Sequence, residues 1–222
     1  MKNNIFYTGI AAVALVMGAC NSNATEASGA DSVAQADSTA TTYTIDAASS
    51  KLGWFGTHSV GTGDHNGTIN IKEGSLSLAG GNITAGSFVI DMTSIKCTDS
   101  LPAEYLTKLH GHLAADDFFN TAKFPTAKFE ITQCEVKADG DNTHFISGNL
   151  TLRDSTKNIS FPAKVTVADG VTATAKVVIN RLDWGINYDK ANMSLAEAAQ
   201  KKLQNGVVSK DITLNISLTA KK

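Results

Sequence analysis

The chain has few of the residues from which metal centres, disulfide scaffolds and redox motifs are built. Its 222 residues contain only three cysteines and three prolines. None of the cysteines or histidines falls into a C-x-x-C, C-x-x-C-H or H-E-x-x-H spacing. These absences exclude a zinc finger, a thioredoxin-type dithiol, a c-type haem and a zincin site.

Charge is also scarce and evenly balanced. Nineteen Lys and Arg residues face 21 Asp and Glu residues, which gives a net charge of −2, and no basic block interleaved with aromatics is present, so no nucleic acid partner is expected. The sequence has neither a G-x-S-x-G elbow nor a correctly spaced G-x-G-x-x-G. No cofactor is expected. The 42% of hydrophobic residues is sufficient for the core of one domain.

The longest apolar run near the N-terminus predicts export. Residues 10–17 are too few to span a bilayer but have the length of a signal-peptide hydrophobic region, so residues 1–19 are predicted to be a signal peptide. The sequence Gly18-Ala19-Cys20 resembles the lipobox of bacterial lipoproteins, which implies that Cys20 is lipidated. The alternative is an ordinary signal peptide that contains a cysteine. We expect an exported protein, anchored to the cell-envelope membrane by acyl chains and facing the periplasm.

The segment after the cysteine is polar and small. Residues 20–42 contain one branched aliphatic residue and no aromatic one, so they are predicted to be a flexible tether ahead of a folded domain at 43–222. In an oxidising compartment, Cys97 and Cys134 could form a disulfide. Two unpaired thiols are the alternative.

The folded domain has the alternation of half-buried strands. From Lys210 to Thr219, Ile212, Leu214, Ile216 and Leu218 alternate with polar residues. Further strands are predicted at 44–45, 52–55, 68–71, 75–78, 86–92, 129–132, 145–152, 158–167 and 171–180. The connections from 138 onward are too short for parallel crossovers, so the strands are antiparallel neighbours.

Two segments have helical spacing, at Leu101 to Leu113 and at Ser194 to Asn205. The predicted fold is therefore all-β: an antiparallel β-barrel of about eight strands with two short helices. Such a barrel can be packed with side chains or hold one small ligand. The pattern alone favours the packed interior.

Polar side chains show no catalytic signature. The five histidines, His58, His65, His110, His112 and His144, are interpreted as surface or capping residues, and the carboxylates Asp116 and Asp117 as a turn cap. The protein is therefore not expected to be an enzyme. Two alternatives stay open: a metal-assisted enzyme that uses His65, His112 and Asp116 on a bound lipid, and a packed barrel that serves as a stress or interaction module.

One long stretch carries a recognisable signature. Residues 111–129 contain His112-Leu113, Asp117-Phe118-Phe119 and Phe124-Pro125 with Phe129 four residues later, and 65–68, 91–95, 148–152 and 180–186 add further matches in the same order. This pattern resembles the YceI-like family of bacterial lipocalin-like polyisoprenoid-binding domains. The resemblance covers about Tyr43 to Ala220.

The resemblance implies a hollow, lipocalin-like barrel that binds an isoprenoid-type or similar amphiphilic lipid without chemistry. Inward apolar residues would line its lumen, and the candidates are Trp54, Phe88, Leu106, Leu109, Leu113, Phe119, Phe129, Phe145, Phe161 and Trp184. Arg181 is the candidate for a polar or phosphorylated head group, since guanidinium forks onto phosphate oxygens. A structural hydrogen-bond network is the alternative role for Arg181. The sequence leaves the oligomeric state open.

Overall fold

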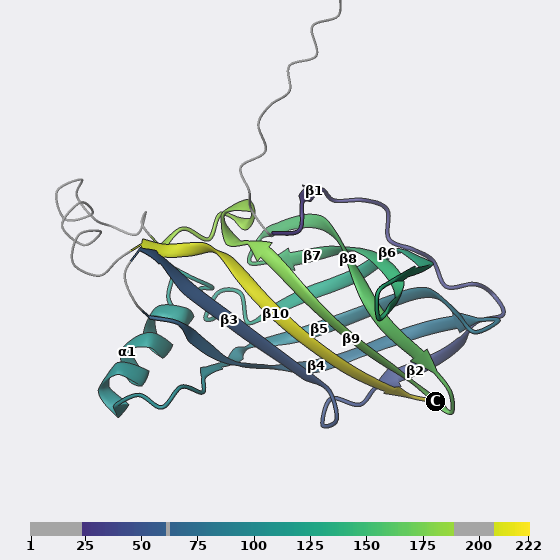
Figure 1. Cartoon of the computed structure of the whole chain (residues 1–222), viewed down its shortest axis with the longest axis horizontal. Helices are drawn as coiled ribbons and strands as arrows, with labels where there is room; N and C mark the ends of the chain where they lie inside the picture. The colour runs from purple at the N-terminus through teal and green to yellow at the C-terminus, as the bar shows by residue number, and fades with distance from the viewer. Residues whose placement is uncertain (1–23, 61–62, 189–206) are drawn as a thin grey trace, which may run out of the picture.

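Eight long strands close into an antiparallel barrel in the computed structural model, which describes residues 24–60, 63–188 and 207–222. The strands follow one another around the ring in chain order: β3 (Lys51–Val60), β4 (His65–Ala79), β5 (Asn82–Cys97), β6 (Thr126–Asp139), β7 (Asn142–Leu152), β8 (Ser155–Val167), β9 (Gly170–Asn180) and β10 (Val207–Lys221). β10 pairs with both β9 and β3, which closes the ring. The predicted all-β barrel is confirmed, and Figure 1 shows its long axis running along the strands.

A short strand, β2 (Thr41–Ile45), completes the wall where β3 ends. β3 pairs with β4 only from His65 to Ile69, and β2 takes over that pairing from Ser75 to Leu78. β2 also pairs with the last residues of β10. β2 and β3 therefore share one position in the ring.

The strands are longer than the sequence pattern predicted. The two predicted strands at 68–71 and 75–78 are parts of β4, joined through an irregularity between Ile71 and Glu73. A bulge changes which face a side chain points to and bends the strand, so the alternation breaks although the strand continues. Such bends let a long strand follow the curved wall.

One predicted helix lies at an end of the barrel. α1 (Ala103–Ala114) follows Pro102 and matches the predicted helix at Leu101 to Leu113. In Figure 1 it lies at the end opposite the C-terminus. A 3-10 helix, η1 (Arg181–Trp184), follows β9. The predicted helix at Ser194 to Asn205 and the predicted signal peptide with Cys20 lie outside the described residues.

The segment predicted as a flexible tether is instead attached to the barrel from Ala24 onward. β1 (Ala27–Gly29) pairs with Lys157 to Ile159 of β8, and the Thr25 amide donates to the Val178 carbonyl of β9. Further along, Asp31 exchanges hydrogen bonds with the side chain of Asn149. Figure 1 shows this segment running along the outside of the barrel to β2. The tether prediction failed because backbone groups pair at a strand edge whatever the side chains are.

The disulfide that the sequence left open is absent, and the alternative of two unpaired thiols holds. Cys97 and Cys134 are both free. Phe129 of β6 pairs with Phe88 of β5, so Cys134 lies beyond this pair in the direction of Ile83 while Cys97 ends the opposite part of β5. At about 3.3 Å per residue the two cysteines are tens of ångströms apart along the sheet, far more than the 7 Å that a disulfide tolerates between Cα atoms.

No helix among the described residues is both long enough and apolar enough to cross a membrane.

Candidate functional site: a two-chamber apolar lumen

The inner face of the barrel is aliphatic and incompletely filled. On β10, Ile212, Leu214 and Ile216 point inward, and each is only partly buried although it faces the interior. In a packed core such side chains would be almost completely buried. The interior is therefore hollow, and the packed interior favoured by the alternation alone is wrong.

The larger cavity, the outer chamber, lies at the α1 end and has a volume of about 440 Å³. Its apolar wall comes from α1 and from β3, β4, β5, β6, β7, β9 and β10. Polar groups also border it, among them the imidazoles of His58, His65 and His112 and the side chains of Lys108 and Asp211. This chamber therefore combines an oily wall with a polar rim.

A smaller cavity, the inner chamber, continues toward the other end of the barrel and has a volume of about 100 Å³. Phe88, Phe129 and Phe161 line it, with ring centroids 6.3 Å and 5.7 Å apart for the successive pairs. Its remaining lining is almost entirely aliphatic. It offers dispersion contacts and burial without directional bonds.

The two chambers meet at a ring of four residues, which we call the waist. Leu52, Ile90, Leu150 and Leu214 each line both chambers, and they come from β3, β5, β7 and β10. The chambers are therefore adjoining parts of one lumen.

Seven of the predicted lumen residues line the chambers, and three do not. Trp54, Leu109, Leu113 and Phe119 border the outer chamber, and Phe88, Phe129 and Phe161 border the inner one. Among the three that do not, Leu106 packs against the core from α1 without lining either chamber. The lumen predictions omitted most of the aliphatic lining, although the alternation in each strand carried that information.

Phe145 and Trp184 were placed wrongly. Phe145 points outward, where the Lys137 ammonium lies 5.1 Å from its ring centroid, while the next residue, Ile146, is buried and lines the inner chamber. Trp184 is buried in η1, and its indole N–H donates to the Leu150 carbonyl at 2.9 Å. Trp184 therefore anchors η1 to β7 without lining either chamber.

Arg181 borders the outer chamber, but its guanidinium is engaged by the backbone. Its side chain is 2% exposed. Nε donates to the Ser209 carbonyl at 3.0 Å, Nη1 to that of Ile186 at 2.7 Å, and Nη2 to that of Val208 at 3.1 Å. This network joins η1 to β10, which is the structural role that the sequence left as the alternative, although with different partners.

Three histidines around the outer chamber are held in the same way. Nδ1 of His58 lies 2.5 Å from the Gly63 carbonyl, Nδ1 of His65 lies 2.8 Å from Oδ2 of Asp99, and Nδ1 of His112 lies 2.7 Å from Oδ2 of Asp117. A carbonyl or carboxylate can only accept, so Nδ1 carries the proton in each ring. The rim thus consists of imidazoles oriented by an oxygen partner.

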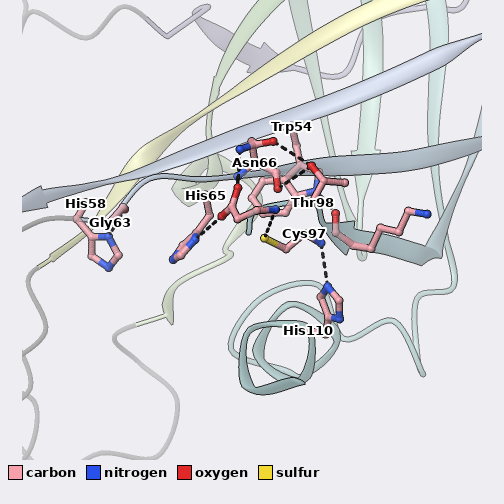
Figure 2. Close-up of polar contacts among 10 residues, drawn as sticks. Trp54, His58, Gly63, His65, Asn66, Cys97, Thr98 and His110 are labelled. Atoms are coloured by element: carbon pink, nitrogen blue, oxygen red, sulfur yellow. Dashed lines mark hydrogen bonds and ion pairs between the residues drawn. The ribbon is translucent and has the colours of Figure 1, made fainter. Parts of the chain in front are cut away.

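A denser polar cluster joins the ends of β4 and β5, as Figure 2 shows. Asn66 donates its backbone N–H and its side-chain amide to Oδ1 of Asp99, while Oδ2 receives His65. The Asp99 amide donates to Cys97 Sγ at 3.4 Å, and the Cys97 amide donates to His110 Nε2 at 2.9 Å. The sequence did not predict this cluster, because 34 residues separate His65 from Asp99.

The ionisation of the cluster follows from these bonds. Burial raises the pKa of the Cys97 thiol above its usual value. Burial acts in the same direction on Asp99, but the hydrogen bonds from His65, Cys97 and the Asn66 amide outweigh it and leave the pKa of Asp99 below its usual value. Asp99 is therefore an anion beside a neutral thiol at neutral pH.

Gly67 lets β5 approach this cluster. A Cβ at this position would overlap the Lys96 carbonyl oxygen and would lie 2.5 Å from Trp54 Nε1. The indole of Trp54 donates to the same carbonyl at 3.2 Å. The motif His65-Asn66-Gly67 therefore supplies two polar side chains of the cluster. It also supplies the small residue that leaves room for the Lys96 carbonyl of β5 and the Trp54 indole of β3.

The structure does not bring His65, His112 and Asp116 together into the one site that the enzyme hypothesis requires. His112 is bonded to Asp117, and Asp116 forms an ion pair with Arg153 at 2.6 Å. Among the described residues, the one group of three potential metal ligands close to one another is His65, Cys97 and Asp99.

Comparisons with known proteins agree with this geometry. A sequence model of the YceI-like domain matches residues 43–220. The chain belongs to the YceI-like family. It is 34% identical over 104 residues to a UPF0312 protein of Shewanella denitrificans, covering 47% of this chain and 50% of that one. It is 33% identical over 102 residues to protein YceI of Escherichia coli, covering 46% of each. The chain thus matches about half the length of these curated relatives.

Solved structures share the fold of this YceI-like chain. BcnA of Burkholderia cenocepacia superposes with a TM-score of 0.56 at 16% identity, covering 80% of this chain and 99% of that one. A polyisoprenoid-binding domain from Saccharophagus degradans, implicated in plant cell wall breakdown, gives a TM-score of 0.55 at 16% identity, covering 81% and 97%. These similarities establish a lipocalin-like barrel.

Proposed function

We propose that this protein binds an isoprenoid-type or similar amphiphilic lipid in its lumen and carries or sequesters it in the cell envelope, without chemical conversion. The observation that carries the proposal is the apolar lumen, with adjoining chambers of about 440 and 100 Å³ that share the four lining residues of the waist. Pockets of several hundred Å³ lined by apolar side chains are typical of small-molecule sites. The polyisoprenoid-binding domain with the same fold supports the class of ligand.

The size of the lumen sets the length of tail that it encloses. At about 30 Å³ per water-sized group, the outer chamber has room for roughly 15 carbon atoms and the inner chamber for roughly three. Each buried methylene contributes about 0.8 kcal/mol before the costs of association. A tail of three to four isoprene units therefore fills the lumen and derives its affinity from burial.

The N-terminal segment supports delivery at a membrane. Thr25 is bonded to Val178, which precedes Ile179 in the wall of the outer chamber. Only residues 21–23 separate an acylated Cys20 from the first described residue, and an extended chain spans at most about 3.6 Å per residue. The anchor would thus hold the barrel close to the bilayer from which the lipid is taken.

The test is the lipid content of the protein purified from its host, measured by native mass spectrometry and by organic extraction. We expect a co-purifying lipid in the parent chain. Phe129→Asp places a carboxylate in the inner chamber and should lower lipid retention at least tenfold. Phe145→Asp makes the same change on the outer face, beside Lys137, and should retain the lipid.

Folding of both variants is checked by circular dichroism. A parent chain that never carries or takes up lipid contradicts the proposal. A folded Phe129→Asp variant with unchanged lipid content does so as well.

A further inference from the structure

The cluster at the ends of β4 and β5 has the composition and spacing of a metal site. One potential ligand atom each from His65, Cys97 and Asp99 lies within 4.8 Å of the other two. In a tetrahedral zinc site with bonds of about 2.0 to 2.3 Å, ligand atoms are about 3.3 to 3.8 Å apart. Side-chain shifts of roughly 1 Å therefore suffice to bring all three onto one ion.

The surrounding bonds orient these side chains as the outer partners of metal ligands do. Oδ1 of Asp99 accepts both hydrogen bonds from Asn66, and Oδ2 of Asp99 is directed at His65. Thr98 in turn donates to the Asn66 side chain at 3.0 Å. Hydrogen bonds of this kind fix the orientation of ligating groups and raise affinity.

The Cys97 thiol also has a hydrogen-bond partner of the kind that supports a metal ligand. The Asp99 amide donates to Cys97 Sγ, and an amide donor stabilises the negative charge that a thiolate carries on a metal. Cys97 is 7% exposed, so bulk oxidants and alkylating agents reach it poorly. A bound cation would offset the burial that disfavours the thiolate, because a coordinating thiol loses its proton.

We propose that His65, Cys97 and Asp99 form a binding site for Zn²⁺ at the rim of the outer chamber. The ion is held by Nδ1 of His65, the thiolate of Cys97 and a carboxylate oxygen of Asp99. The Cys97 proton is released to solvent, and the proton that Nδ1 carries in the metal-free protein moves to Nε2 by exchange with solvent. Three protein ligands leave the fourth position open. This site borders the lumen, because His65 lines the outer chamber. The proposal does not depend on lipid binding.

The ligand set favours zinc over harder cations. Magnesium and calcium select oxygen ligands, whereas thiolate and imidazole suit Zn²⁺. Asp99 and the thiolate together neutralise the charge of the ion. Magnesium therefore serves as the negative control.

The experiment uses the full chain, carrying Cys20→Ser in every sample so that Cys97 and Cys134 are the thiols compared. Zn²⁺ is titrated in competition with a chromophoric chelator, and Co²⁺ is added as a spectroscopic substitute. We expect one Zn²⁺ per chain, no competition by Mg²⁺, and a thiolate-to-cobalt charge-transfer band. That band is read on a chain with all three ligands intact, so it does not depend on how a ligand variant folds.

Variants then assign the ligands. Cys97→Ser, Asp99→Asn and His65→Gln should each weaken Zn²⁺ binding at least tenfold, and Cys97→Ser should abolish the charge-transfer band. Cys134→Ser is the matched control, a change at the other free thiol, and should leave both readouts unchanged. The proposal is overturned if the intact chain shows no charge-transfer band, or if Cys97→Ser binds Zn²⁺ as tightly as its parent.

Discussion

Closing the waist should shorten the tail that the lumen accepts. Leu214 lines both chambers, and replacing it with Trp adds an indole where the chambers meet. The inner chamber of about 100 Å³ then becomes inaccessible. It holds roughly three carbon atoms at about 30 Å³ each. At about 0.3 to 0.8 kcal/mol per carbon, the loss is about 1 to 2.5 kcal/mol, or about five- to seventyfold in Kd.

This loss should depend on tail length. Geraniol, farnesol and geranylgeraniol carry two, three and four isoprene units, and binding is measured by titration calorimetry or by displacement of a fluorescent fatty-acid probe. Leu214→Trp should raise the Kd for geranylgeraniol by about five- to seventyfold and leave the Kd for geraniol nearly unchanged. Val136→Trp, at a site that is 70% exposed, controls for the added indole. Equal losses for all three alcohols would refute a length effect, and no loss for any would refute a lumen site.

Three further predictions concern stability, measured by urea and thermal unfolding. Gly67→Ala should lower the free energy of unfolding by about 2 to 3 kcal/mol, because the added Cβ overlaps the β5 backbone. Gly56→Ala, which has open space around the added carbon, should lower it by less than about 1 kcal/mol. Arg181→Lys should lower the free energy of unfolding by about 2 to 4 kcal/mol, because hydrogen bonds to backbone carbonyls are lost. The same change should weaken the binding of a prenyl phosphate no more than that of a prenyl alcohol. A loss of affinity for the phosphate alone would support the head-group role of Arg181. Hydrogen bonds from Lys221 and Ser49 lower the pKa of Asp46 from 3.8 to about 2, so stability present above about pH 4 should fall toward pH 2, and Asp46→Asn should flatten that fall.

Alternation along the strands was sufficient to predict the barrel wall. Ile212, Leu214, Ile216 and Leu218 occupy every second position of β10, and the structure directs this set to the inside. Short turns, such as the one before Asn142, fixed the antiparallel order. Both signals are local, since they depend on the period of a strand and on the reach of a turn.

Details that depend on the pairing of distant strands could not be predicted in this way. Phe145 and Ile146 are adjacent apolar residues, so the sequence does not say which of them faces inward, and a shift of one residue exchanges the faces. The contact between His65 and Asp99 depends on a β4–β5 register with several irregularities. The attachment of β1 depends on backbone hydrogen bonds, which leave no trace in the side-chain pattern.

The distribution of polarity along the lumen determines the orientation of a bound amphiphile. The rim of the outer chamber presents oriented imidazoles, Lys108 and Asp211, whereas the inner chamber is lined by aromatic and aliphatic side chains with Thr174 as an exception. A polar head group driven into the inner chamber would lose its hydrogen bonds to water and gain almost none, at a cost of about 1 to 3 kcal/mol or more. In the proposed complex the tail would therefore enter first and the head group would stay at the α1 end. That end also carries His65, Cys97 and Asp99, so a zinc ion bound there would lie on the side of the lumen where a head-group oxygen could reach it.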